Sequence, residues 1–174
     1  EGTAILAKDF AERLTEKGLT VLELDTAAGF LDRLSILPEA RTGAGMPAVR
    51  AMHDVTEGGV ATALFELSAA SGCGIEIHLD AIPIEPVTDR ICRALKLDPL
   101  GLIGSGSLLT VIAEAAANKY VHTLRKKGIP AAVIGTVTGR GTEAVAISED
   151  ARVDFPQFDA DEITKMFSRP AQGW

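Results

Sequence analysis

Apolar residues recur along this chain with two spacings, one typical of helices and one typical of strands. After residue 58 the spacing is i, i+3/i+4, i+7, which predicts a helix over 58–71 with one buried face. The apolar residues of that face are Val60, Ala61, Leu64, Phe65 and Leu67. Strict alternation of apolar and polar residues follows, and it predicts a strand over 75–79 with one buried face.

The remaining pattern predicts an alternation of helices and strands. Further helices are predicted at 3–17, 27–37, 87–96, 115–127 and 161–167. Further strands are predicted at 48–53, 108–113, 131–138 and 143–148. Gly18, Gly72 and Gly128 stand where helices should end, Pro38 should end the second helix, and the composition of 41–47 is that of a mobile linker.

These elements predict an α/β (α+β) fold with three α/β/α layers and a mixed sheet. The run at 108–113 is continuously apolar, which indicates a central strand covered on both faces. A chain of 174 residues is long enough for one well-buried core. Because only 5% of the residues are aromatic while 47% are hydrophobic, that core should be mainly aliphatic.

Charge and cysteine content exclude several classes of function. The net charge of −7 argues against general nucleic-acid binding. No apolar stretch reaches the roughly 18 residues of a membrane span. Cys73 and Cys92 lack metal-type spacing, so we expect reduced, buried thiols, as in a cytoplasmic protein.

The candidate chemistry lies in His53-Asp54-Val55-Thr56-Glu57-Gly58-Gly59, which leads directly into the predicted helix 58–71. Backbone N–H groups and the positive end of the helix dipole favour phosphate, and a carboxylate such as that of Asp54 suits Mg²⁺. Alternatively, Asp54 or Thr56 only caps the helix and the glycines shape its start. His53 either touches phosphate or substrate, or orients the loop.

A second polar loop, Ser105-Gly106-Ser107, precedes the apolar run at 108–113. It either presents N–H and hydroxyl groups to substrate or phosphate, or forms a tight turn that leads into the strand. His78 and His122 are expected on exposed faces, and three scattered histidines do not predict a zinc site.

Several motifs occur in an order that matches a known family. They are Gly2-Thr3-Ala4, Leu34-Ser35-Ile36-Leu37, His53 to Gly59, Ser71-Gly72-Cys73-Gly74, Asp98-Pro99-Leu100, Ser105-Gly106-Ser107 and Ala132-Val133-Ile134-Gly135. In this order the chain resembles the C-terminal domain of the aminoimidazole ribonucleotide (AIR) synthase-related superfamily. Within it, the chain is most similar to the hydrogenase expression/formation (maturation) branch.

The resemblance implies an AIR synthase C-terminal-domain-like fold, partly ferredoxin-like, and chemistry on ATP. Family members activate an amide, carbonyl or similar acceptor by phosphoryl transfer, in which Mg²⁺ neutralises charge. The resemblance implies catalytic roles for His53 and Asp54, with Asp54 as metal ligand. It implies substrate or phosphate contacts at Thr56, Gly58, Gly59, Ser105, Gly106 and Ser107.

The resemblance also implies a missing partner domain. The chain starts at Glu1, inside an apparent element, so we expect residues 1–47 to lead from an absent N-terminal ATP-binding domain into the C-terminal domain at 48–174. ATP and Mg²⁺ are then expected in the full-length protein, which should be a homodimer in the cytoplasm. The isolated fragment should hold no cofactor and be inactive.

One departure and one alternative limit this interpretation. The hydrogenase-maturation enzyme carries a cysteine at its C-terminus, whereas this chain ends Arg169-Pro170-Ala171-Gln172-Gly173-Trp174. If Trp174 is the natural end, the reaction in its usual form is disfavoured. The second hypothesis is a non-catalytic homologue that serves as a binding or assembly module.

Overall fold

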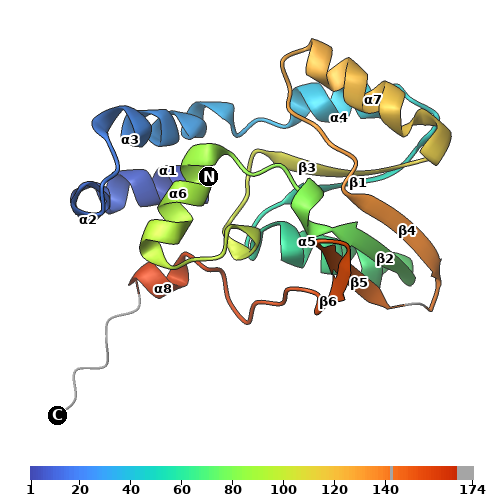
Figure 1. Ribbon diagram of the computed structural model, residues 1–174. Helices are drawn as coiled ribbons and strands as arrows, with labels where there is room; N and C mark the ends of the chain where they lie inside the picture. The colour runs from blue at the N-terminus through green and yellow to red at the C-terminus, as the bar shows by residue number, and fades with distance from the viewer. Residues whose placement is uncertain (142, 168–174) are drawn as a thin grey trace.

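The computed structural model describes residues 1–141 and 143–167 (Figure 1). Its α-helices are α1 (Gly2–Asp9), α2 (Ala11–Glu16), α3 (Val21–Ala28), α4 (Leu37–Ala44), α5 (Gly59–Ser71), α6 (Pro86–Leu95), α7 (Glu114–Lys126) and α8 (Thr164–Phe167). Its strands are β1 (Val49–Val55), β2 (Cys73–His78), β3 (Ser107–Ile112), β4 (Gly135–Arg140), β5 (Ala144–Ser148) and β6 (Ala151–Val153). Short 3₁₀ turns are η1 (Gly29–Arg33), η2 (Leu79–Ala81) and η3 (Pro99–Gly101).

The strands form two sheets. β1 and β3 pair antiparallel as a two-stranded ribbon, and the other strands form a four-stranded sheet in the order β4-β2-β5-β6. That sheet is mixed, because β2 runs parallel to β5 and antiparallel to β4. The α/β class and the mixed sheet are therefore confirmed. The prediction of one sheet with 108–113 at its centre is wrong, since among the described strands β3 pairs with β1 alone, and its residues 108–112 are half-buried.

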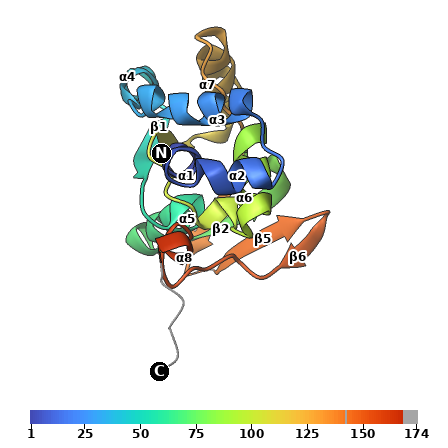
Figure 2. The ribbon, with the colours of Figure 1, turned by 90° about the vertical axis from the view of Figure 1, so that its left-hand side faces the viewer.

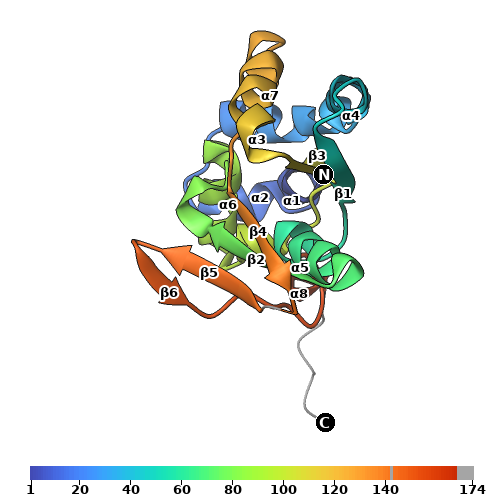
Figure 3. The same ribbon diagram turned by 90° about the vertical axis from the view of Figure 1, so that its right-hand side faces the viewer.

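Helices cover the ribbon on both sides. α4 and α7 lie over one face of β1 and β3, while α5 lies between the ribbon and the four-stranded sheet (Figures 1 and 3). The Tyr120 hydroxyl of α7 donates to the Glu39 carbonyl of α4 at 3.2 Å, which joins the two covering helices. This covering matters because two strands alone are marginally stable in water.

Two hydrophobic cores hold the chain together. The first joins α1, α2, α3 and α6, with Leu6, Leu14, Ile91 and Cys92 almost fully buried, and it fills the helical half seen at the front of Figure 2. The second lies between α5 and the four-stranded sheet and is built on Leu64, Ile75 and Ile77. Both cores are largely aliphatic, as composition predicted.

The cysteines are free, as predicted, but only one is buried. Burial, assisted by the nearby carboxylates of Asp98, Asp89 and Glu162, raises the pKa of the Cys92 thiol to about 12. Cys92 is therefore a neutral core residue, whereas Cys73 is only half-buried. None of the described helices is long and apolar enough to cross a membrane.

The N-terminal third differs most from the predicted elements. The helix expected at 3–17 is broken at Phe10, whose backbone leaves the helical region (φ −122°, ψ 26°). The helix expected at 27–37 lies instead at 21–28 as α3. Pro38 does not end a helix but stands in the first turn of α4, where its missing N–H costs nothing. The expected linker at 41–47 is accordingly helical as far as Ala44.

Four predicted elements are confirmed within one or two residues: the helix 58–71, the strand near 75–79, and the helices near 87–96 and 115–127. The expected face of α5 is correct except for Phe65, whose side chain is exposed. β6 was not predicted. The C-terminal residues Arg169 to Trp174, which contain no cysteine, lie outside the described residues.

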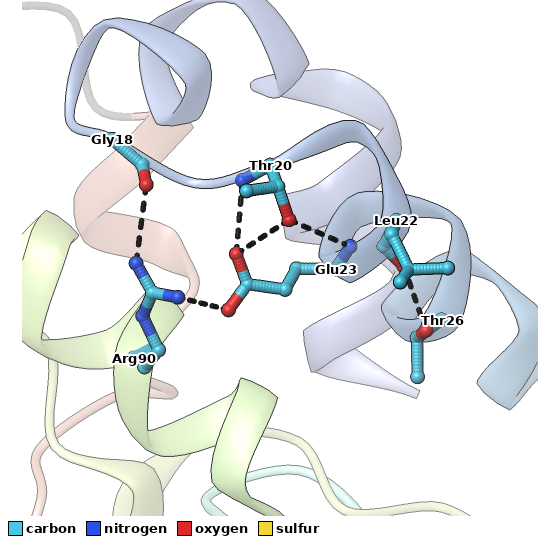
Figure 4. A network of polar contacts seen from close by, with 6 residues as sticks. All are labelled: Gly18, Thr20, Leu22, Glu23, Thr26 and Arg90. Carbon is cyan, nitrogen blue, oxygen red and sulfur yellow. Dashed lines mark hydrogen bonds and ion pairs between the residues drawn. The ribbon is translucent and has the colours of Figure 1, made fainter.

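A capping box fixes the start of α3 and connects it to α6 (Figure 4). The Thr20 hydroxyl accepts from the Glu23 N–H at 3.3 Å, and the Glu23 carboxylate accepts from the Thr20 N–H at 2.9 Å. Arg90 of α6 donates to the same carboxylate and, at 3.1 Å, to the Gly18 carbonyl. These bonds, chiefly those from Thr20, lower the pKa of Glu23 below its ordinary 4.5.

We expect Glu23→Gln to remove a pH-dependent part of the stability. Because the pKa of Glu23 is lower in the folded chain, its contribution is complete above the unfolded pKa of 4.5 and is lost as the pH falls through the folded pKa. Urea unfolding should show that the variant is less stable than wild type at pH 7 and that the difference shrinks toward pH 3. Glu12→Gln on α2 is the control, and an equal effect of both substitutions would contradict the assignment.

Candidate functional site

Pairing of β1 with β3 brings the two predicted site loops together. Asp54 stands opposite Leu108 and Val55 opposite Ser107, so the end of β1 lies beside the start of β3. Beyond the paired residues, the Gly104 N–H donates to the Thr56 carbonyl at 3.2 Å. The segments 53–59 and 105–107 therefore occupy the same end of the ribbon, although about fifty residues separate them in sequence.

Asp54 presents an open carboxylate at this end. It is the penultimate residue of β1 rather than a loop residue, which corrects the expected end of this strand at residue 53. Its side chain is 62% exposed, and Oδ1 lies 3.7 Å from Nδ1 of His53. A carboxylate this accessible is available to a cation.

His53 connects β1 to α5. Its Nε2 lies 2.9 Å from Oε2 of Glu66, while its other ring nitrogen faces Asp54. The imidazole thus stands between two carboxylates, and the contact to Glu66 fixes the orientation of the ring. This geometry favours the interpretation that His53 orients the site strand, and a catalytic role for it stays a prediction.

The start of α5 is capped from a distance. Gly58 has a positive φ of 75° and is buried, and no side chain from its own segment caps the helix. Instead, the Gly58 N–H donates to Oδ2 of Asp161 at 2.7 Å. The alternative in which Asp54 or Thr56 caps this helix is therefore wrong, and the carboxylate of Asp54 is not engaged in capping.

The two glycines have different tasks. The Gly59 N–H donates to the Thr56 carbonyl at 3.1 Å, so both glycine N–H groups have partners within the chain. To bind phosphate, the N–H groups of Gly58 and Gly59 would have to give up these hydrogen bonds, so this role stays a prediction. Gly59, with φ 64°, also lies against η3, because a Cβ at this position would come within 2.4 Å of the Leu100 carbonyl oxygen.

The second loop is a tight turn packed against the helical half of the chain. The Ser107 N–H donates to the Gly104 carbonyl at 3.1 Å, and Gly106 has φ 102°. A Cβ at Gly106 would lie 3.0 Å from the Arg33 carbonyl oxygen. Ser107 is exposed and Ser105 is half-buried, so their substrate contacts stay predictions.

Asp54 does not belong to a preformed metal cage. Within the described ranges, no three His, Cys, Asp or Glu residues are grouped so as to hold a metal ion. This fits Mg²⁺, which proteins often bind through one or two carboxylates while phosphates and water complete the octahedron. Asp54 alone can supply one oxygen ligand, and exposed Thr56 and Glu57 stand beside it in the chain.

Two acidic residues of the site surroundings were missed in the sequence. The segment 161–167 is predicted only as a helix with no part in the site, yet Asp161 bonds Gly58 and Glu162 is only 2% exposed. An aspartate before a short helix is a recognisable capping signal, and Asp161 does bond the Ile163 N–H at 2.9 Å. Its contact with Gly58 spans 103 residues and leaves no local signal.

Comparison with known proteins identifies the family. A family model described as AIR synthase related protein, C-terminal domain, matches residues 11–148. The chain belongs to this family. The match covers both site loops and all of β1 to β5.

Several proteins to which this chain is similar are named for hydrogenase maturation. Carbamoyl dehydratase HypE of Escherichia coli K12 is 34% identical over 134 residues, which cover 73% of this chain and 40% of that protein. A crystal structure of E. coli HypE has a TM-score of 0.65 at 29% identity, covering 79% of this chain and 48% of that one. HypE in complex with ATP shares the fold, with a TM-score of 0.59 at 21% identity over 80% of this chain and 41% of that one. The chain thus spans less than half the length of these relatives.

We expect Gly59→Ala to destabilise the chain by about 3 kcal/mol, since it combines left-handed strain with a backbone clash. Gly72, the C-cap residue of α5, has the same φ of 64° but open space around it. Gly72→Ala should therefore cost only the strain, about 1 kcal/mol. Chemical denaturation of both variants measures the difference, and equal losses would show that the contact with η3 is unimportant.

Proposed function

We propose that this chain is the C-terminal half of an ATP-dependent enzyme of the AIR synthase-related family, and that it completes an active site whose nucleotide-binding loops lie in another domain. The reaction is of the hydrogenase-maturation type, in which an amide or carbonyl oxygen is activated by phosphoryl transfer. The whole protein is proposed to act as a homodimer in the cytoplasm. Similarity to carbamoyl dehydratase HypE supports this reaction class.

The observation that carries the proposal is the state of Asp54. Its carboxylate is exposed at the ribbon end where both site loops meet, and the N–H of Gly58, the N-cap residue of α5, is bonded to Asp161 instead. If Asp54 served only to cap α5, its carboxylate would be bonded to the start of that helix. Asp54 is instead open toward solvent, as expected of a group that meets a metal–phosphate complex held by another domain.

Each residue has a chemical task in this proposal. Asp54 would supply one oxygen ligand to Mg²⁺, whose charge offsets that of the transferred phosphoryl group. His53, held by Glu66, keeps the end of β1 in place and stands 3.7 Å from the Asp54 carboxylate. Thr56 and Ser107 offer exposed hydroxyl groups on the same end of the ribbon.

Asp54→Asn in the protein that includes the nucleotide-binding domain should reduce ATP-dependent turnover on the order of 10²-fold or more, because it removes charge needed at the reacting centre. The KM for Mg²⁺ should rise as well. Steady-state kinetics with varied Mg²⁺ measure both effects. Full activity of Asp54→Asn would refute the metal-ligand role.

Stability provides the control. Because Asp54 is exposed and caps nothing, Asp54→Ala should change the free energy of unfolding by less than about 0.5 kcal/mol.

A wild-type protein with no ATP turnover and no binding of Mg-ATP would instead favour a non-catalytic assembly module. The exposed strand residue Arg50, on the same β1, is a matched position for a substitution outside the proposed site.

A further inference from the structure

The contact between Asp161 and Gly58 joins the end of the described chain to the start of α5. Oδ2 of Asp161 accepts from Gly58 at 2.7 Å, and Oδ1 accepts from Ile163 at 2.9 Å. Both carboxylate oxygens are thus used, and the side chain is held in one orientation. A negative charge at a helix N-terminus is also stabilised by the helix dipole.

The segment that carries Asp161 is itself firmly attached. The buried carboxylate of Glu162 accepts from the Asp98 N–H at 2.9 Å and pairs with Lys165. The Glu162 N–H donates to the Gly101 carbonyl at 3.0 Å. The ring of Phe158 lies so close to Gly101 that a Cβ there would come within 2.7 Å of it.

We call residues 158–162 the strap, because they tie η3 to the first turn of α5. The strap bonds Asp98 and Gly101 on one side and Gly58 on the other. η3 in turn lies directly against Gly59. The start of α5 is therefore held from two directions, and the four residues before it connect directly to Asp54.

We propose that Asp161 is a positioning residue of the site: by occupying the Gly58 N–H, it keeps the cap of α5 filled and leaves Asp54 free to bind a cation. This rests on the proposed function of Asp54. Without Asp161, the vacant N–H and the helix dipole would attract the carboxylates nearest in sequence, those of Asp54 near the end of β1 and of Glu57. Asp54 would then be drawn from the position in which it meets the metal.

The experiment compares Asp161→Ala, Asp161→Asn and wild type in the protein that includes the nucleotide-binding domain. Asp161→Ala should raise the KM for Mg²⁺ on the order of 10-fold, because a small displacement of a ligand weakens its contact strongly. Asp161→Asn should restore only part of this loss, since its single amide oxygen can accept from Gly58 but no longer from Ile163 as well. Asp159→Asn, an exposed position on the same strap, is the control and should behave as wild type.

A second readout does not depend on catalysis. In amide spectra of this chain, the Gly58 signal should move upfield and exchange with solvent at least 10-fold faster in Asp161→Ala than in wild type. Unchanged Gly58 exchange in Asp161→Ala, or displacement of the wild-type Gly58 contact by Mg-ATP, would overturn the proposal. A melting temperature lowered with no change in KM for Mg²⁺ would also overturn it, because that result describes a purely structural cap.

The two proposals fail in different ways. If wild type shows no Mg²⁺-dependent turnover, or Asp54→Asn is fully active, the proposed function falls and the positioning role falls with it, even though the Gly58 contact can still be measured. If Asp54→Asn is inactive and Asp161→Ala keeps a normal KM for Mg²⁺, only the positioning role is refuted.

Discussion

The antiparallel register of β1 and β3 is the constraint on which the candidate site depends. With Val55 opposite Ser107, the loops that follow β1 and precede β3 meet at one end of the ribbon. A slip of one residue would turn every side chain of the strand to the other face, and Val55 would leave its buried position against Gly104. Since two strands are weak alone, the register is maintained by α4 and α7 on one side and α5 on the other.

Elements with a clear period could be predicted from the sequence, because their burial depends on local spacing. This holds for α5, whose Leu64 faces a core, and for β2, where Ile75 and Ile77 are buried and Glu76 is exposed. The division into two sheets could not be predicted in this way. Strand pairing is a long-range choice, and the apolar run of β3 looks the same whether it lies at a sheet centre or in a half-buried ribbon.

The errors near the N-terminus have a different cause. The signal for α3 was present, since Thr20 and Glu23 have the spacing of a capping box, but the apolar pattern placed the helix later. At α4, the composition of 41–47 suggested a linker and Pro38 suggested a helix end, whereas the helix runs to Ala44 and Pro38 lies in its tolerated first turn. In the site, local motifs located the loop around Asp54, but not the carboxylate of Asp161, because the latter meets its partner only through the tertiary fold.

The Ser105–Ser107 turn also connects the two hydrophobic cores. Leu102 just before it belongs to the helical core, and Leu109 just after it packs on the core beneath α5. Because both cores begin within a few residues of this turn, local unfolding of either core extends close to it. A ligand bound to both the turn and the end of β1 would restrain the two cores at once. Local unfolding of one core would then be coupled to local unfolding of the other.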